Sequence, residues 1–342
     1  MVACFYTAAL LASTHWPHRP IRATCVPPAL VGQLGWEEPV PSHRLCWRLP
    51  SFLPAGVCTA CFWASPCRWL SADCCSGCLP VSTETVAWFP SLNEAGEAIA
   101  LVDGERRLTY TELNDAVMRV VACLLDGEDS LKEERVAFLY PASFDYAALI
   151  IGVVAAGGIA VPLSVHASAG ELSHCLSVAG VRRLLLPAEM RSEALDAVCE
   201  ALGVEQLAVG DLPDAQVPNV LPLAPEQGAL IVFTSGTTGK PKGVVHTVAS
   251  VSAMVTSLIE AWGWEPTDVI PLFLPLHHVH GIVNILLCAL WRGATVDLYA
   301  RFDVEQVCHK VANDSYSVFM AVPTIYVKLI AYLKTLGEAT RT

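Results

Sequence analysis

The sequence predicts an α/β fold in which mostly parallel sheets are flanked by helices. From about residue 84, short apolar runs alternate with stretches of helical periodicity. The apolar runs are continuous, as in strands that are buried on both faces of a parallel sheet. Hydrophobic residues make up 54% of the 342 residues and charged residues only 16%, so the chain can bury a sizeable core.

The elements follow in order along the chain. We expect a strand over 98–103, a turn at Asp103-Gly104 and a second strand over 107–110. Thr111 is expected to cap a helix. That helix has its apolar positions at Leu113, Val117, Val120, Val121 and Leu124. Further strands are expected over 135–140, 159–163, 183–186, 229–233 and 269–274, and further helices over 168–179, 248–260 and 323–334. The proline-rich stretch 212–226 reads as a surface connector.

One apolar stretch has the length of a membrane span. Residues 146–163 run for 18 positions without a charge. Gly157-Gly158 and Pro162 interrupt it, and no basic cluster flanks it, as an orientation signal would require. We therefore expect a buried helix followed by a short buried strand, and no membrane span.

Charge is distributed unevenly. The formal net charge of −12 argues against a nucleic-acid partner, which needs a basic face. Residues 1–80 carry five Arg and three acids, a net of +2, so residues 81–342 carry −14. The first 80 residues also hold nine of the 14 Cys and five of the nine Trp. The sequence therefore predicts a Cys/Trp/Pro-rich leader over 1–80 and the main domain over 81–342.

The leader leaves two questions open. Its first residues lack acids and carry Arg19 and Arg22, which suits either a transit peptide or a mis-assigned gene start. We expect a mitochondrial or other organellar location in the first case and a cytoplasmic one in the second. Two C-x2-C pairs, at Cys58/Cys61 and Cys75/Cys78, would suit a zinc site, but unstructured sequence is favoured and no metal is assigned. The cysteines after residue 80 are expected to be reduced, buried thiols.

The sharpest motif is ALIVFTSGTTGKPKGVV, residues 229–245. An apolar strand leads into a loop whose glycines allow backbone N–H groups to approach an anion, while hydroxyls and lysines add donors and charge. The expected polyphosphate-binding residues are Thr234, Ser235, Gly236, Thr237, Thr238, Gly239, Lys240 and Lys242. The spacing is not that of a P-loop, because Pro241 follows Lys240 and the chain returns to a strand instead of entering a helix.

A histidine-rich segment, PLHHVHG, follows the strand over 269–274. His277, His278 and His280 admit three interpretations: a metal site, a structurally satisfied pair, or contacts to a substrate. No acidic or Cys ligand stands beside them, and a strand-end loop cannot aim all three inward, which disfavours a metal.

The loop motif resembles that of a known enzyme family. TSGTTGKPKG (234–243) resembles the phosphate loop of the AMP-forming acyl-adenylate superfamily, and the likeness covers about residues 84–335, including LTYTEL (108–113) and AAGGIAVPL (155–163). It implies the amino-terminal part of that superfamily's α/β fold. It also implies ATP with Mg²⁺ and CoA as cosubstrates of an acid–CoA ligase. His278 would lie beside the reacting carboxylate, and Lys240 would face solvent near the phosphates.

Two segments resemble malonyl-CoA synthetases. They are HVHG (278–281) and FMAVPTIY (319–326). The resemblance implies malonate as substrate and a place in fatty-acid metabolism, with His280 beside the distal carboxylate, helped by an Arg such as Arg292 or Arg301. Thr324 would begin a helix near the acid, although simple capping is an alternative. A ligase for another acid and a non-catalytic product remain as rival hypotheses.

Several family segments are not found before Thr342. They are a later Gly-Ser-Ala-type loop, a Tyr-Gly-x-Thr-Glu segment whose Glu would hold Mg²⁺, the Asp that binds ribose, and the small carboxy-terminal domain. The resemblance therefore implies a truncated ligase, and we expect no measurable CoA-ligase activity from the chain as given.

Overall fold

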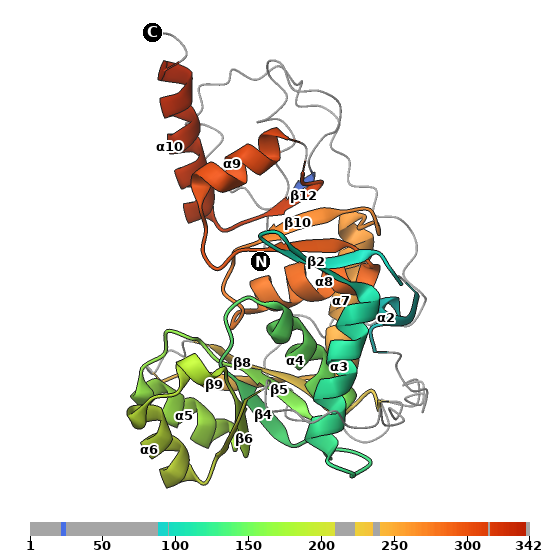
Figure 1. Ribbon diagram of the computed structural model, residues 1–342, viewed down its shortest axis with the longest axis vertical. Helices are drawn as coiled ribbons and strands as arrows, with labels where there is room; N and C mark the ends of the chain where they lie inside the picture. The colour runs from blue at the N-terminus through green and yellow to red at the C-terminus, as the bar shows by residue number, and fades with distance from the viewer. Residues whose placement is uncertain are drawn as a thin grey trace, which may run out of the picture. The chain divides into compact units, whose positions relative to one another are not determined.

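The structure is a computed structural model, which describes residues 22–24, 88–94, 96–208, 223–234, 240–313 and 315–339. The chain divides into two compact units, one formed by Met1–Pro28 with Glu84–Thr342 and the other by Ala29–Thr83. All described residues belong to the first unit (Figure 1). The leader over 1–80, with its cysteine pairs, lies outside the described residues except for 22–24, and so does most of the connector.

A six-stranded sheet has the strand order β7-β6-β4-β5-β8-β9. Its strands are β4 (Arg135–Phe138), β5 (Ile159–Pro162), β6 (Arg183–Leu185), β7 (Glu205–Leu207), β8 (Gly228–Thr234) and β9 (Lys242–Thr247). All neighbours are parallel except β8 and β9, which are antiparallel and joined by the loop with the glycines and lysines. The expected return to a strand after this loop is confirmed.

A four-stranded sheet has the order β10-β11-β2-β3. Its strands are β10 (Val269–Leu272), β11 (Thr295–Leu298), β2 (Ile99–Asp103) and β3 (Arg106–Thr109). β10, β11 and β2 are parallel, whereas β2 and β3 form a hairpin whose turn holds Gly104 at φ +61°. Beside β10 lies β12 (Val318–Met320), which pairs in parallel with β1 (Arg22–Thr24).

Helices separate most of these strands. The described helices are α2 (Ser91–Glu94), α3 (Tyr110–Leu125), α4 (Phe144–Ala155), α5 (Ala169–Ala179), α6 (Glu193–Leu202), α7 (Val248–Trp262), α8 (Cys288–Arg292), α9 (Val304–Ala312) and α10 (Pro323–Ala339). A 3₁₀ turn, η3 (Ala188–Met190), and a π-helix, η5 (His280–Leu287), complete the set. The mostly parallel α/β architecture is thus confirmed.

The start of α3 corrects one expectation. Thr109, not Thr111, is the N-cap: its hydroxyl accepts from the amide of Glu112, and the Glu112 carboxylate accepts from the amide of Thr109. Thr111 already lies in the first turn. The Thr-x-x-Glu spacing of a capping box selects Thr109, because only a Thr three residues before a Glu can make both bonds.

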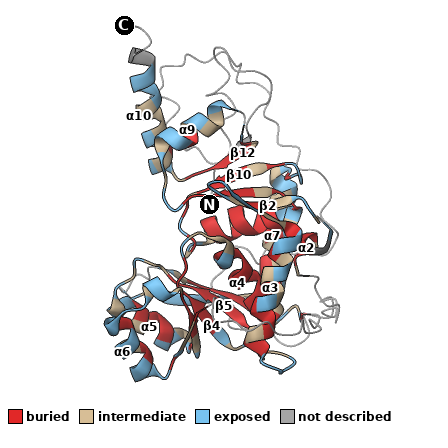
Figure 2. Cartoon of the chain, in the orientation of Figure 1, coloured by how far each residue is buried: buried red, intermediate tan, exposed pale blue. Residues whose placement is uncertain are grey.

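The six-stranded sheet is covered on both faces. Val136 and Phe138 of β4 join one apolar cluster, while Ala137 and Leu139 join the other. This alternation follows from the strand's period of two. The second cluster holds the side chains of α5 and α6, and the first holds those of α3, α4 and α7. Figure 2 shows buried residues on β4 and β5 and on parts of α4 and α5.

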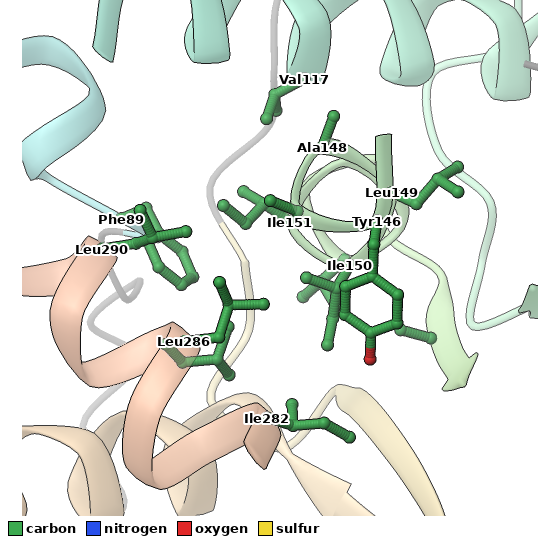
Figure 3. Packing of buried hydrophobic residues seen from close by; sticks show 14 of the residues in the cluster. Phe89, Val117, Tyr146, Ala148, Leu149, Ile150, Ile151, Ile282, Leu286 and Leu290 are labelled. Atoms are coloured by element: carbon green, nitrogen blue, oxygen red, sulfur yellow. The ribbon is translucent and has the colours of Figure 1, made fainter. Parts of the chain in front are cut away.

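The first cluster also reaches the four-stranded sheet. It includes Leu101 of β2, Ile270 of β10 and Val296 of β11 together with side chains of both sheets' helices. Ile150 and Ile151 of α4 belong to the same cluster as Leu286 of η5 and Leu290 of α8, and Figure 3 shows them on facing sides of it. A shared layer of helices therefore fixes the end of β8 relative to the end of β10.

The uncharged stretch 146–163 is the buried helix α4 followed by the buried strand β5, as expected. None of the helices in the described part of the chain combines the length and the apolar character needed to cross a bilayer.

Candidate active site

The candidate phosphate loop joins the antiparallel strands β8 and β9. The β8–β9 ladder runs through Phe233↔Gly243 to a last pair, Thr234↔Lys242, and the Thr234 hydroxyl donates to the Lys242 carbonyl at 3.5 Å. Thr234, Lys240 and Lys242 are exposed. The predicted site residues Ser235, Gly236, Thr237, Thr238 and Gly239 lie outside the described residues. Both lysines thus stand on the returning limb, where nothing among the described residues covers them.

The returning limb has a second anchor on α5. Nε2 of His174 lies 2.8 Å from the carbonyl oxygen of Pro241. On the strand itself, a Cβ at Gly243 would lie 3.1 Å from Cγ2 of Ile231. The limb is therefore packed closely against both the helix and the neighbouring strand.

The histidine segment lies near the same edge of the sheet. β5 and β8 are parallel neighbours, so their carboxyl ends share an edge, which is where open α/β sheets bind ligands. The loop leaves the carboxyl end of β8, and His166 follows β5. The histidine segment is joined to α4 by the hydrogen bond from Tyr146 to Leu276, and the charge of His166 contributes to the lowered pKa of His277.

Two contacts shape the histidine segment. The hydroxyl of Tyr146, fully buried on α4, donates to the carbonyl of Leu276 at 2.5 Å. A Cβ at Gly281 would lie 2.6 Å from the carbonyl oxygen of Pro275, so only glycine allows η5 to begin this close to the preceding loop. η5 is a π-helix, a form that recurs at functional sites.

The three histidines differ in environment. The rings of His277 and His278 are 4.2 Å apart at centroid and inclined by 52°. Burial lowers the pKa of His277 to about 4, and the charges of His278 and His166 add to that effect. His277 is therefore neutral at pH 7, whereas His278 is exposed. His278 is free to face a substrate.

His280 begins η5 and is half-buried. Burial lowers its pKa, and its Nε2 is buried without a hydrogen-bond partner among the described residues. A buried polar atom without a partner costs free energy, so a ligand or water that hydrogen-bonds to this nitrogen would be stabilised.

The remaining candidates are not joined to the histidines by a described contact. Thr324 is exposed in the first turn of α10. Arg292 donates through Nε to the carbonyl of Trp264 at 2.9 Å, so this donor of its guanidinium already has a partner within the protein. Arg301 is exposed after β11.

The described residues fit a polyphosphate better than a resident metal. Two exposed lysines on a tight strand return supply positive charge. Within the described ranges, no group of three His, Cys, Asp or Glu side chains could hold a metal ion. The histidines therefore form no such group. The thiols of Cys123, Cys175, Cys199, Cys288 and Cys308 are free, as expected, with the first and last only half-buried.

No sequence motif marks Tyr146, His174 or His166 as functional. Each acts on a segment that lies far away in the chain, and no local motif marks such a contact. The one available signal was a polar tip within an apolar helix, as at Tyr146, because a buried hydroxyl needs a partner.

Comparisons with known proteins agree with this arrangement. A family model described as AMP-binding enzyme matches residues 89–341. The mitochondrial malonate–CoA ligase ACSF3 of Homo sapiens is 40% identical over 270 residues, which make up 74% of this chain and 45% of the relative. A malonate–CoA ligase of Arabidopsis thaliana is 30% identical over 281 residues, 71% of this chain and 46% of the relative. The chain thus spans less than half the length of these two relatives.

Solved structures show the same fold. Apo MatB from Rhodopseudomonas palustris superposes with a TM-score of 0.66 at 22% identity, covering 72% of this chain and 51% of that one. The inhibitor-bound N-terminal domain of FACL13 from Mycobacterium tuberculosis gives 0.64 at 26% identity, covering 70% and 63%. With a family model spanning most of its length and the fold of these proteins, the chain belongs to the AMP-binding enzymes.

Proposed function

We propose that this chain is part of an ATP-dependent acid–CoA ligase that converts malonate to malonyl-CoA, for use in fatty-acid metabolism. The observation that carries the proposal is the strand–loop–strand with two exposed lysines, in a chain whose histidine segment is joined to the same core by Tyr146. Relatives named malonate–CoA ligase support the choice of acid. Because the chain spans only part of these relatives, the complete reaction is proposed for the whole protein.

The loop would hold the nucleotide. Thr234, Lys242 and residues 235–239 would contact the β- and γ-phosphates of ATP, with Lys240 facing solvent near them. Mg²⁺ would arrive bound to these phosphates. Neutralising and positioning the phosphates supplies most of the catalysis in such reactions.

The histidine segment would hold the acid. His278, which is exposed beside the neutral His277, would donate to the reacting carboxylate. His280 would donate through the unpartnered Nε2 to the distal carboxylate, which needs a buried donor. Thr324 would lie at the helix start near the acid. The carboxylate attacks the α-phosphorus and pyrophosphate leaves. The CoA thiol then displaces AMP, losing its proton, to give the thioester.

Nucleotide binding tests the loop. We expect MgATP to bind the chain, with affinity reduced about tenfold by Lys242→Met, because one charge-assisted contact is lost. Lys328→Met, on the exposed face of α10, is the matched control and leaves affinity unchanged. Calorimetric titration measures both. Failure of the wild-type chain to bind MgATP would refute the proposal.

A comparison of two acids as ligands tests the proposed role of His280. With MgATP present, we expect malonate to bind more tightly than propionate, which lacks the second carboxylate. His280→Leu should remove that difference while leaving MgATP affinity intact. Equal affinities in the wild-type chain would favour the rival hypothesis, a ligase for another acid. Acid binding by the whole protein without acyl-CoA formation would favour a non-catalytic role.

We also propose a mitochondrial location. The relatives named ACSF3 are described as mitochondrial, and the acid-free opening with Arg19 and Arg22 suits an organellar leader. A fusion of residues 1–80 to a fluorescent protein should reach mitochondria, and diffuse cytoplasmic signal would contradict this.

A further inference from the structure

After the phosphate loop, the chain returns to the sheet through Pro241, which has no backbone N–H to bind the neighbouring strand. The β8–β9 ladder ends at Thr234↔Lys242, so Lys240 and Pro241 lie beyond its last pair. Proline has no amide hydrogen and cannot extend the ladder by donating to β8. Its carbonyl is the group through which the backbone at this point can be fixed.

That carbonyl is bound by a side chain from α5. Nε2 of His174 lies 2.8 Å from the oxygen of Pro241. A carbonyl only accepts, so Nε2 must carry the hydrogen and donate it. The contact joins two segments that are 67 positions apart in sequence.

α5 is a firm support for this bond. Its N-terminus carries a capping box between Ser168 and Glu171, and its inner face buries Leu172, Cys175 and Leu176 against the six-stranded sheet. His174 stands between these buried positions and is itself half-buried. A donor on a capped, packed helix holds its acceptor more closely than one on a loop.

We propose that His174 is a positioning residue for polyphosphate binding: its hydrogen bond to Pro241 sets the direction of the Lys240–Lys242 limb. The inference rests on the proposed function, since it assigns no new ligand. His174 would touch no substrate. It would act by holding the backbone at Pro241, which lies between Lys240 and Lys242.

The test compares two variants of similar size and helix propensity, His174→Leu, which has no donor, and His174→Gln, which keeps one. The probes are magnesium tripolyphosphate and MgATP, titrated into the full chain. We expect His174→Leu to weaken both about fivefold, the worth of one ordinary hydrogen bond, and His174→Gln to restore most of the loss. His309→Leu, on the exposed face of α9, is the matched control and changes neither.

A second readout does not depend on ligand. Amide hydrogen exchange at Lys240 and Lys242 should be faster in His174→Leu than in the wild type, with the melting temperature little changed. Should His174→Leu fail to fold, His174→Ala replaces it. Wild-type binding that persists in the donor-free variant, or a loss that Gln does not relieve, would overturn the inference alone. No binding by the wild-type chain would overturn the proposed function and this inference together.

Discussion

The hydroxyl of Tyr146 donates to the carbonyl of Leu276, a residue 130 positions later, over 2.5 Å. Tyr146 stands on α4, which packs against the six-stranded sheet, whereas Leu276 belongs to the loop after β10 of the other sheet. The bond therefore ties the histidine segment to the sheet that carries the phosphate loop. The phosphate loop and the histidine segment, which are proposed to hold different substrates, are thus connected through α4.

Tyr146→Phe should destabilise the fold and disturb the histidines. Removing the hydroxyl leaves the buried Leu276 carbonyl without this donor, which costs about 1–3 kcal/mol in the free energy of unfolding. Urea denaturation measures that cost. Modification of His277 and His278 by diethyl pyrocarbonate should become faster, because the segment is no longer fixed.

Tyr110→Phe is the matched control for this experiment. Tyr110 is also fully buried, and its hydroxyl donates to the carbonyl of Ala294 at 2.7 Å, away from the histidines. It should lose similar stability without changing histidine reactivity. If both variants altered histidine reactivity equally, the effect would be one of general stability and not of position.

Gly281→Ala should be strongly destabilising. The added Cβ would lie 2.6 Å from the carbonyl oxygen of Pro275, and backbone cannot yield as a flexible side chain can. Gly170→Ala is the control, because a Cβ there meets nothing within 4 Å and Ala favours the helix α5 by up to about 1 kcal/mol. We expect opposite shifts in melting temperature. A neutral Gly281→Ala would mean that η5 moves away from the loop at little cost.

Much of the fold could be predicted because its signals are local. Continuous apolar runs identified β4, β5, β8 and β10, and helical patterns identified α3, α5 and α7, although the expected cap of α3 lay two residues too late. The division into two sheets could not be predicted in this way. β11 and β2 are neighbours although 196 positions separate their first residues, Thr295 and Ile99, and such pairings depend on packing.

The residues of the candidate site fall into the same two groups, those that local motifs mark and those that only long-range contacts reveal. Thr234, Lys240, Lys242 and the histidines are candidates predicted from motifs, since residue types at fixed spacing mark them. The residues that hold these segments in place, Tyr146 and His174, were not. Their partners are backbone carbonyls, which carry no sequence signature, so only the folded chain identifies them.

Acid should weaken the fold through His277. Its pKa is about 4 in the folded chain against 6.5 for an ordinary His, so between these values the unfolded chain binds a proton that the folded chain does not. The free energy of unfolding is therefore highest above pH 6.5 and falls as the pH drops toward 4. Burial lowers the pKa of His246 and His280 too, and acts in the same direction.

The measurement is the urea midpoint at pH 7, 6 and 5. His277→Gln should flatten the decline, because no proton is then taken up at that position on unfolding. His309→Gln, on the exposed face of α9, should leave the slope as in the wild type. Identical slopes for the wild type and His277→Gln would show that another group controls the acid response.

Lys310→Met should lower the free energy of unfolding, because it leaves a buried carboxylate unpaired. Nζ of Lys310 lies 2.6 Å from Oδ2 of Asp297, whose side chain is only 5% exposed, and Tyr316 donates to the same oxygen. Losing the lysine leaves the carboxylate without its cation, which costs about 3 kcal/mol or more. Lys132→Met is the control: its ion pair with Glu128 is 78% and 72% exposed, and such pairs contribute about 0–1 kcal/mol.

The double variant Asp297→Leu/Lys310→Met separates two explanations of that loss. If Lys310→Met is destabilising because it leaves a buried charge unpaired, removing Asp297 as well should recover most of the stability, since no uncompensated carboxylate remains. If instead the Lys310 cation supplied the stability through the ring of Tyr299, whose centroid lies 5.3 Å from Nζ, the double variant would be no better than the single one. We expect recovery, measured by urea denaturation of all four members of the cycle.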